Sequence, residues 1–239
     1  YKVSTANYKS KITTGAWRAP YTNFLAFAEQ SFFNELATEL DKDHPALLIE
    51  LLQNVKGTKD ERIQYSPERM EETIKLAVKK SNWGNTTEGT YQGFSAYYSH
   101  NTHVAEVADI VMKNGMPLVK KVTVAVDCGI VVNPLGAKNQ VEGGVIDGIG
   151  HAMYGNFSFK EGTPQAVNFD NYRLIRMQET PEVSTHFVES GLSPTGLGEP
   201  GLPPAGGAVA NAIHTATGER LLKQPFINEL EMSKSKILG

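Results

Sequence analysis

The sequence has a single cysteine, no long apolar run and no excess of either charge. Cys128 alone cannot form a disulfide within the chain, and it excludes a CxxC zinc site or a cysteine-ligated iron–sulfur cluster built from this chain. Lys and Arg total 23 against 26 Asp and Glu, which argues against nucleic acid as a partner. No stretch of about 20 apolar residues is present to span a bilayer, since even residues 122–132 contain Asp127.

What is present is an ordinary globular composition. The 239 residues, 40% of them hydrophobic and 21% charged, suffice for one large core or two modest ones. The first residue is Tyr1 rather than Met, so we expect a portion of a longer polypeptide, and no compartment can be inferred.

Helices are expected in the first third of the chain. Residues 22–40 place apolar side chains three to four apart, which predicts one buried stripe formed by Phe24, Phe27, Ala28, Phe32, Leu36 and Leu40. A short helix is expected to start at Pro45, and another at Ser66 as N-cap, ending at residues 82–84. The last of these has Met70, Ile74, Ala77 and Val78 on its inner side.

From about Tyr91 the pattern changes to a period of two. Residues 104–112 and 118–126 flank Asn114-Gly115 and predict a hairpin. A glycine-rich helix is expected at 136–155, a helix from near Ala205 to Gly218, and further strands at 157–159, 167–169 and 183–188. We therefore expect an α+β fold with helices and an antiparallel or mixed sheet, divided into a helix-rich segment 1–90 and an α+β portion 91–239.

A loop rich in glycine and proline surrounds Glu199. Glycines at 196, 198 and 201 allow close approach of a ligand, and prolines at 200, 203 and 204 stiffen the loop, so the carboxylate of Glu199 would be held rigidly, as a general base requires. The alternative is a surface glutamate in an ordinary turn. The GxxxxGK[ST] and strand-linked GxGxxG phosphate patterns are absent.

Two further segments carry candidate binding residues. Arg18 could bind a phosphate or carboxylate, with the Trp17 ring forming one wall of the binding site. From the residues alone, the favoured alternative is that Trp17 packs in the core and Arg18 caps a nearby element. Gln140 can recognise the edge of a heterocycle, and Gly143 with Gly144 would let the helix backbone approach it; tight helix packing is the alternative.

Other candidates are weaker. His100 and His103 would point to opposite faces of a strand, so a shared metal ion is not expected. Cys128 is expected to be a small packed side chain. The sequence lacks a GxSxG elbow, which leaves a metal-free hydrolase using Glu199 and His214 as the weakest hypothesis.

Taken in order, several segments resemble the molybdenum hydroxylases, the xanthine dehydrogenase and aldehyde oxidase superfamily, and most closely the large subunits of the isoquinoline 1-oxidoreductase type and bacterial relatives labelled aldehyde dehydrogenases. The matching segments are residues 15–20 (Gly-Ala-Trp-Arg-Ala-Pro), 126–134, 140–144, 196–201, 203–205 and 210–218. The resemblance covers most of residues 12–226, and its last part is the most specific.

The resemblance implies roles for individual residues. Glu199 corresponds to the glutamate that removes a proton during hydroxylation of an electron-poor carbon. Arg18, Gln140, Gly143, Gly144 and Gly198 correspond to segments beside a molybdenum-molybdopterin cofactor, expected in its cytosine dinucleotide form. The implied substrates are N-heterocycles or aldehydes, and the implied electron acceptor is a partner subunit with [2Fe-2S] clusters.

The sequence also departs from that family. The family's Met-Gly-Gln-Gly segment and apical glutamine loop are missing from this sequence. We therefore expect an inactive portion of the large subunit, which binds no cofactor by itself and needs the N-terminal remainder of that subunit. The alternative is a cofactorless α+β binding or assembly module that retained the fold without the chemistry.

Overall fold

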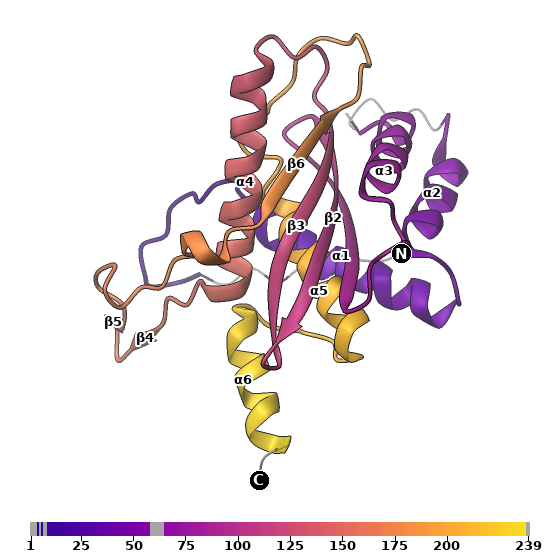
Figure 1. Cartoon of the computed structure of the whole chain (residues 1–239). Coiled ribbons are helices and arrows are strands. Elements are labelled where there is room, and N and C mark those ends of the chain that lie inside the picture. Colours follow the sequence, from indigo (N-terminus) through magenta and orange to yellow (C-terminus); the bar gives the residue numbers. More distant parts are fainter. Residues whose placement is uncertain (1–3, 5, 7–8, 58–64, 238–239) are drawn as a thin grey trace.

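The computed structural model describes residues 4, 6, 9–57 and 65–237. A four-stranded sheet and six α-helices make up most of this part of the chain (Figure 1). The helices are α1 (Thr22–Glu39), α2 (His44–Val55), α3 (Pro67–Ser81), α4 (Pro134–Tyr154), α5 (Pro203–Thr217) and α6 (Phe226–Ile237), with one 3₁₀ turn, η1 (Met177–Glu179). The strands are β1 (Thr90–Ser99), β2 (Thr102–Lys113), β3 (Met116–Asp127), β4 (Phe159–Lys160), β5 (Thr163–Pro164) and β6 (Glu182–Phe187).

The main sheet is mixed. Its strand order is β1-β2-β3-β6, with β1, β2 and β3 antiparallel and β6 parallel to β3. The hairpin predicted around Asn114-Gly115 is confirmed, and both residues have the positive φ that such a tight turn requires, 52° and 71°. The expected α+β class with a mixed sheet is therefore confirmed.

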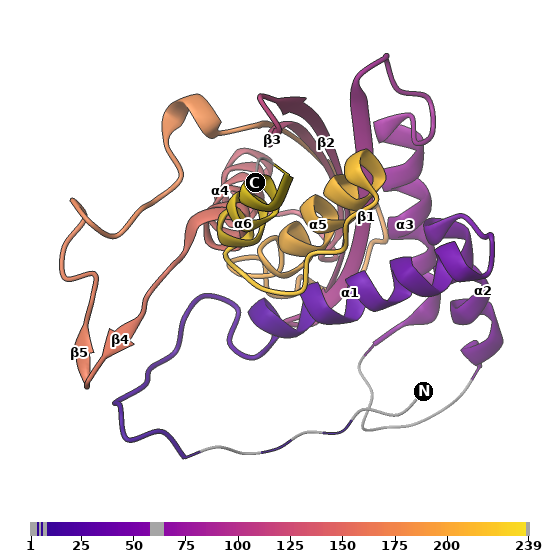
Figure 2. The same ribbon diagram turned by 90° about the horizontal axis from the view of Figure 1, so that it is seen from below.

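Helices cover both faces of this sheet. One core cluster joins β2 and β3 to α4 and α5, and a second joins β1, β2 and β3 to α2 and α3. Figure 2 shows α1 running across these layers, where it contacts α5, β1 and α2. The proposed division at residue 90 stays a prediction. No helix of the described chain has the length and apolarity needed to cross a bilayer.

The caps of α3 follow the sequence. The Ser66 side chain accepts a hydrogen bond from the Arg69 N–H, Pro67 occupies the first turn, and Asn82 closes the helix in the left-handed conformation. Met70 and Ile74 are buried as predicted.

The buried stripe predicted for α1 is wrong. Phe24, Phe32 and Leu40 are 57%, 48% and 51% exposed. The buried face instead carries Asn23, Ala26, Gln30, Ser31 and Ala37.

The reason lies in α5, against which this face packs closely. A Cβ at Gly207 would lie 3.0 Å from the Cβ of Gln30, so the contact admits only small or hydrogen-bonded side chains. Gln30 is satisfied there, because its Oε1 accepts a hydrogen bond from the Ala96 N–H of β1.

The region after α4 contains less strand than predicted. Only Phe159 of the predicted strand 157–159 lies in a strand, the two-residue β4, and residues 167–169 form no strand. The Asn171 side chain instead accepts hydrogen bonds from the Val167 and Asn168 N–H groups, which folds this segment into a turn. Helix α6 is an element that the sequence patterns did not indicate.

Candidate functional site

Arg18 connects three separate segments of the chain. Its Nε and Nη2 donate to the carbonyl oxygen of Gly198 at 2.9 and 2.6 Å. Nη2 also donates to the side-chain Oε1 and the backbone oxygen of Gln140 at 3.0 and 3.2 Å. Three of the predicted site residues are thereby brought together. Arg18 thus joins the Gly198 loop to α4, and neither contact is the nearby cap that the residues alone favoured.

Glu199 lies at the same place, with its side chain 37% exposed. Its Oε1 accepts a hydrogen bond from the Ala19 N–H at 3.0 Å, and its Oε2 lies 2.9 Å from Nε2 of His100. Both carboxylate oxygens therefore have a fixed neighbour, while part of the side chain stays open to solvent.

The segment before α1 adopts an unusual backbone to reach Glu199. Ala19 and Tyr21 have φ values of 58° and 65°, in the left-handed region that costs a residue with a Cβ about 1–2 kcal/mol. Local hydrogen bonds hold this turn, from the Asn23 side chain to the Arg18 carbonyl and from the Thr22 hydroxyl to the Ala19 carbonyl. Such local strain is typical of functional segments.

The loop that carries Glu199 is attached to the β1–β2 turn. The Gly196 N–H donates to the carbonyl of His100 at 3.2 Å, and the Thr102 hydroxyl contacts the Gly196 carbonyl at 2.5 Å. A Cβ at position 196 would lie 2.9 Å from the His100 carbonyl oxygen. Glycine is therefore required here for the loop to lie against the turn.

The glycines of α4 divide into two kinds. A Cβ at Gly144 would lie 3.2 Å from the Gly201 carbonyl carbon, and one at Gly148 only 2.6 Å from the Leu202 oxygen, so both serve tight packing against the loop. A Cβ at Gly143 would meet only Nη1 of Arg18, at 4.0 Å. Gly143 is thus the glycine whose backbone stays accessible beside the guanidinium.

Two residues at the site, Asp147 and His151, were not predicted. Asp147 lies 3.7 Å from Nη1 of Arg18 and 3.2 Å from Nε2 of His151. Trp17 packs against the His151 ring with centroids 4.0 Å apart, and it is partly exposed, so the favoured core position for Trp17 is wrong. The signal in the sequence was the spacing of positions 140, 143, 147 and 151, which places polar and glycine positions on one face of α4.

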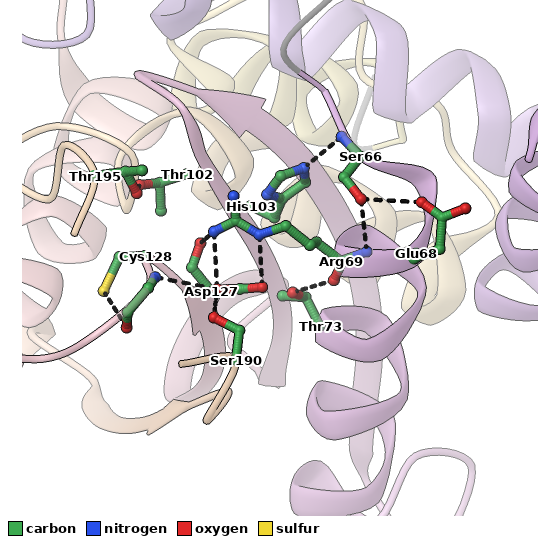
Figure 3. A network of polar contacts seen from close by, with 11 residues as sticks. Ser66, Glu68, Arg69, Thr73, Thr102, His103, Asp127, Cys128, Ser190 and Thr195 are labelled. Carbon is green, nitrogen blue, oxygen red and sulfur yellow. Dashed lines mark hydrogen bonds and ion pairs between the residues drawn. The ribbon is translucent and has the colours of Figure 1, made fainter. Parts of the chain in front are cut away.

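Figure 3 shows a network of polar contacts around Asp127, which includes Ser190 from the segment that precedes the Glu199 loop. Arg69 of α3 donates to both carboxylate oxygens of Asp127, at 2.8 and 2.9 Å. The Gly129 N–H and the Ser190 hydroxyl donate to the same carboxylate. Burial by itself raises the pKa of Asp127, but the hydrogen bonds from Arg69, Gly129 and Ser190 outweigh it and hold the pKa below its ordinary value. This ion pair lies at the end of β3, and the Ser190 hydroxyl connects it to the loop that follows β6.

The two candidate histidines have different neighbours. His103 is buried, accepts a hydrogen bond from the Ser66 N–H, and burial lowers its pKa to about 4, so it is neutral at physiological pH. His100 faces Glu199. Cys128 is buried, as predicted, and burial raises the pKa of its thiol. Among the described residues no cluster of three His, Cys, Asp or Glu side chains is arranged to hold a metal ion.

The site therefore combines the Arg18 cation, the exposed Gln140 amide, the accessible backbone of Gly143 and the anchored Glu199 carboxylate. Arg18 and Gln140 can bind an anionic ligand rich in hydrogen-bonding groups, and Glu199 can accept a proton.

Comparisons with known proteins agree on a family. Residues 42–181 match the molybdopterin cofactor-binding domain model, a range that includes Gln140 but not Arg18 or Glu199. The chain is 30% identical over 226 residues to a membrane-bound aldehyde dehydrogenase [pyrroloquinoline-quinone] of Gluconacetobacter polyoxogenes, covering 88% of this chain and 29% of that protein. It is 28% identical over 214 residues to isoquinoline 1-oxidoreductase subunit beta of Brevundimonas diminuta, covering 87% of this chain and 26% of that protein.

Solved structures show the same fold. Aldehyde oxidoreductase from Desulfovibrio gigas matches with a TM-score of 0.66 and 14% identity, over 90% of this chain and 42% of that one. Quinoline 2-oxidoreductase from Pseudomonas putida 86 matches with a TM-score of 0.51 and 19% identity, over 55% of this chain and 18% of that one. The chain spans less than a third of the length of the two curated relatives above. It belongs to the molybdopterin cofactor-binding domain family of the molybdenum hydroxylases.

Proposed function

We propose that this chain forms part of the cofactor site of a molybdenum hydroxylase that hydroxylates N-heterocycles or oxidises aldehydes with oxygen derived from water, and that Glu199 is its general base. The names of the relatives support this substrate range, since they include an aldehyde dehydrogenase, an isoquinoline oxidoreductase and a nicotinate dehydrogenase. The [2Fe-2S] partner subunit and the N-terminal remainder of the large subunit belong to the same proposal.

The residues at the site fit a molybdopterin cofactor. Arg18 supplies a positive charge for an anionic group, and the exposed amide of Gln140 supplies donors and an acceptor for a heterocycle edge. A Cβ at Gly198 would meet no atom within 4 Å, so that side of the loop is open. Arg18, Gln140, Gly143 and Gly198 would hold the cofactor, in the cytosine dinucleotide form that we propose, and Gly144 would keep α4 close to the loop.

The cofactor, when bound, supplies the two-electron oxidation, and the chain supplies positioning and proton transfer. Glu199 accepts one proton on its carboxylate. The Ala19 N–H holds one oxygen of that carboxylate in place, so the side chain is already positioned before the reaction. The observation that carries the proposal is this convergence of Arg18, Gln140 and Glu199 from three distant segments.

The test is Glu199→Gln in the intact enzyme. Gln keeps the shape and hydrogen bonding of Glu but cannot accept a proton at neutral pH, so kcat should fall by about 10² or more at matched molybdenum content. Glu189→Gln, at an exposed position in the same loop region, is the matched control and should keep the parental rate. A rate for Glu199→Gln within a few-fold of the parent would remove Glu199 from the proposed role.

One observation favours a second candidate, a cofactorless binding or assembly module. Arg18 is already bonded to Gly198 and Gln140, so its guanidinium has partners in the chain itself. Elemental analysis of the intact protein separates the two, because only the enzyme contains stoichiometric molybdenum.

A further inference from the structure

His100 makes a contact with Glu199 that the proposed function does not use. Its Nε2 lies 2.9 Å from Oε2 of Glu199, and the imidazole is 32% exposed to solvent. The residue stands in the two-residue turn between β1 and β2, where His100 and Asn101 have φ values of 53° and 62°. The ring therefore contacts the carboxylate and is itself partly open to solvent.

The contact is built into the backbone. Gly196, three positions before Glu199, is bonded to the His100 carbonyl and has no room for a Cβ there. Thr102, two positions after His100, bonds to the Gly196 carbonyl and to the Thr195 hydroxyl. Both chain segments are thus fixed to each other next to the pair, unlike two exposed side chains that meet by chance.

The other ring nitrogen of His100 continues into a line of hydroxyl groups. Nδ1 lies 2.6 Å from the Ser99 Oγ, and that atom lies 2.9 Å from the Thr22 Oγ1. Each hydroxyl can turn its hydrogen toward either neighbour. When Nδ1 carries a hydrogen, Ser99 accepts it, and when Nδ1 is bare, Ser99 donates to it. His100 therefore keeps its partners both as a neutral ring and as an imidazolium.

We propose that His100 positions the Glu199 carboxylate and relays to solvent the proton that Glu199 accepts, an inference that rests on the proposed function. In this step the proton leaves Oε2 of Glu199 and joins Nε2 of His100, which restores the carboxylate and gives an imidazolium. The imidazolium then releases the proton on Nδ1 to the Ser99 hydroxyl, whose own hydrogen passes to Thr22, a partly exposed residue, and from there to water, so the pair returns to its starting charge. No electrons move in this step.

The other charged groups near the Glu199 loop are linked to Arg18 rather than to His100. Arg18 reaches the carbonyl of Gly198, and Asp147 of α4 pairs with Arg18 and with His151. On the His100 side, the ring contacts the Ser99 hydroxyl, which in turn contacts the Thr22 hydroxyl, and neither hydroxyl titrates in the physiological range. His100 is thus the titratable group in contact with Glu199 on this side of the loop.

The test is chemical rescue in the intact, molybdenum-loaded enzyme. For His100→Ala we expect kcat to fall about tenfold with KM within about twofold of the parent, because proton removal and not substrate binding is impaired. Imidazole added to the buffer should restore most of the lost kcat in the variant and leave the parent unchanged. His186→Ala, on β6 beside Ser184, is the control and should keep the parental kcat without a response to imidazole. An unchanged kcat in His100→Ala, or a loss that imidazole and its methyl derivatives fail to restore, would overturn the relay.

A second measurement does not depend on turnover. Deuterium exchange at C2 of the His100 ring, followed by mass spectrometry across a pH series, should change its pH dependence when Glu199 is replaced by Gln, whereas exchange at His186 should not. Identical curves for His100 in the two proteins would contradict the pairing. If Glu199→Gln itself keeps full turnover, the proposed function fails, whatever His100 does. The two failures are therefore distinguishable.

Discussion

The Arg18 guanidinium donates to the carbonyl oxygen of Gly198 through two of its nitrogens, although 180 positions separate the residues in the sequence. Gly198 directly precedes Glu199, so this bond sets the position of the loop that carries the carboxylate. The same guanidinium has Gly143 beside it, at the accessible part of α4. Arg18 therefore has two tasks in the proposal, one in the loop geometry and one toward the cofactor.

Lysine should not replace Arg18. Its single ammonium group cannot bind the Gly198 carbonyl and the Gln140 amide in the same forked geometry. For Arg18→Lys in the intact enzyme we expect the free energy of unfolding to fall by about 1–2 kcal/mol, measured by urea titration, with a lower molybdenum content. Arg176→Lys, at an exposed position, is the matched control and should change neither quantity. Full molybdenum content in Arg18→Lys would contradict the role toward the cofactor.

Alanine at two glycines of α4 should separate packing from cofactor binding. Gly148→Ala places a Cβ 2.6 Å from the Leu202 oxygen and should destabilise the fold by about 1–3 kcal/mol. Gly143→Ala meets only Nη1 of Arg18, at an ordinary contact distance of 4.0 Å, and should raise stability by up to about 1 kcal/mol through helix propensity, while lowering cofactor content in the intact enzyme. The measurements are urea unfolding and molybdenum analysis on both variants. Unchanged molybdenum in Gly143→Ala would exclude Gly143 from the cofactor site.

The sequence predicted features that local chemistry decides. The caps of α3 and the hairpin at Asn114-Gly115 depend on side chains and φ preferences within a few residues, and both are confirmed. The expected loops of Arg18, Gln140 and Glu199 are in contact as one site, although their chemical roles stay predictions.

The errors share a physical origin in tertiary contacts. The buried face of α1 could not be identified from the sequence. The close approach of Gly207 in α5 determines which residues of α1 are buried. His100 was not predicted as a site residue, because it was expected to lie in a strand. It lies in a turn instead, and its partner Glu199 is 99 positions away in the sequence. Residues 167–169 have the composition of a strand and no neighbouring strand to pair with in the described part of the chain.

The 239-residue chain on its own should fold and carry no molybdenum. It spans less than a third of its two relatives described above and lacks the Met-Gly-Gln-Gly segment and the apical glutamine loop of the resembled family, so much of the cofactor surroundings would have to come from elsewhere. Circular dichroism should show a cooperative thermal transition, and elemental analysis should find molybdenum well below one atom per chain. Stoichiometric molybdenum in this isolated chain would overturn the expectation.

The stability of the fold should depend on a buried acid in β2. Glu106 is fully buried, and neither of its carboxylate oxygens has a hydrogen-bond partner among the described residues. Burial raises its pKa well above the ordinary value of 4.5, so the folded protein keeps this proton where the unfolded chain has released it. Stability therefore falls as pH rises from about 4.5 toward the folded pKa.

Glu106→Gln removes this titration, so the difference in unfolding free energy between variant and parent should move in favour of the variant as pH rises from 4 to 8. Glu71 provides a control of opposite sign. Hydrogen bonds from Lys56 and Lys75 lower the pKa of Glu71 to about 2, so its contribution is present above pH 4.5 and is lost as pH falls toward 2. Glu71→Gln should therefore destabilise the fold at neutral pH, with a difference that shrinks in acid. Urea unfolding at several pH values measures both slopes, and a difference for Glu106→Gln that does not vary with pH would show that Glu106 is ionised in the folded protein, or that water reaches it.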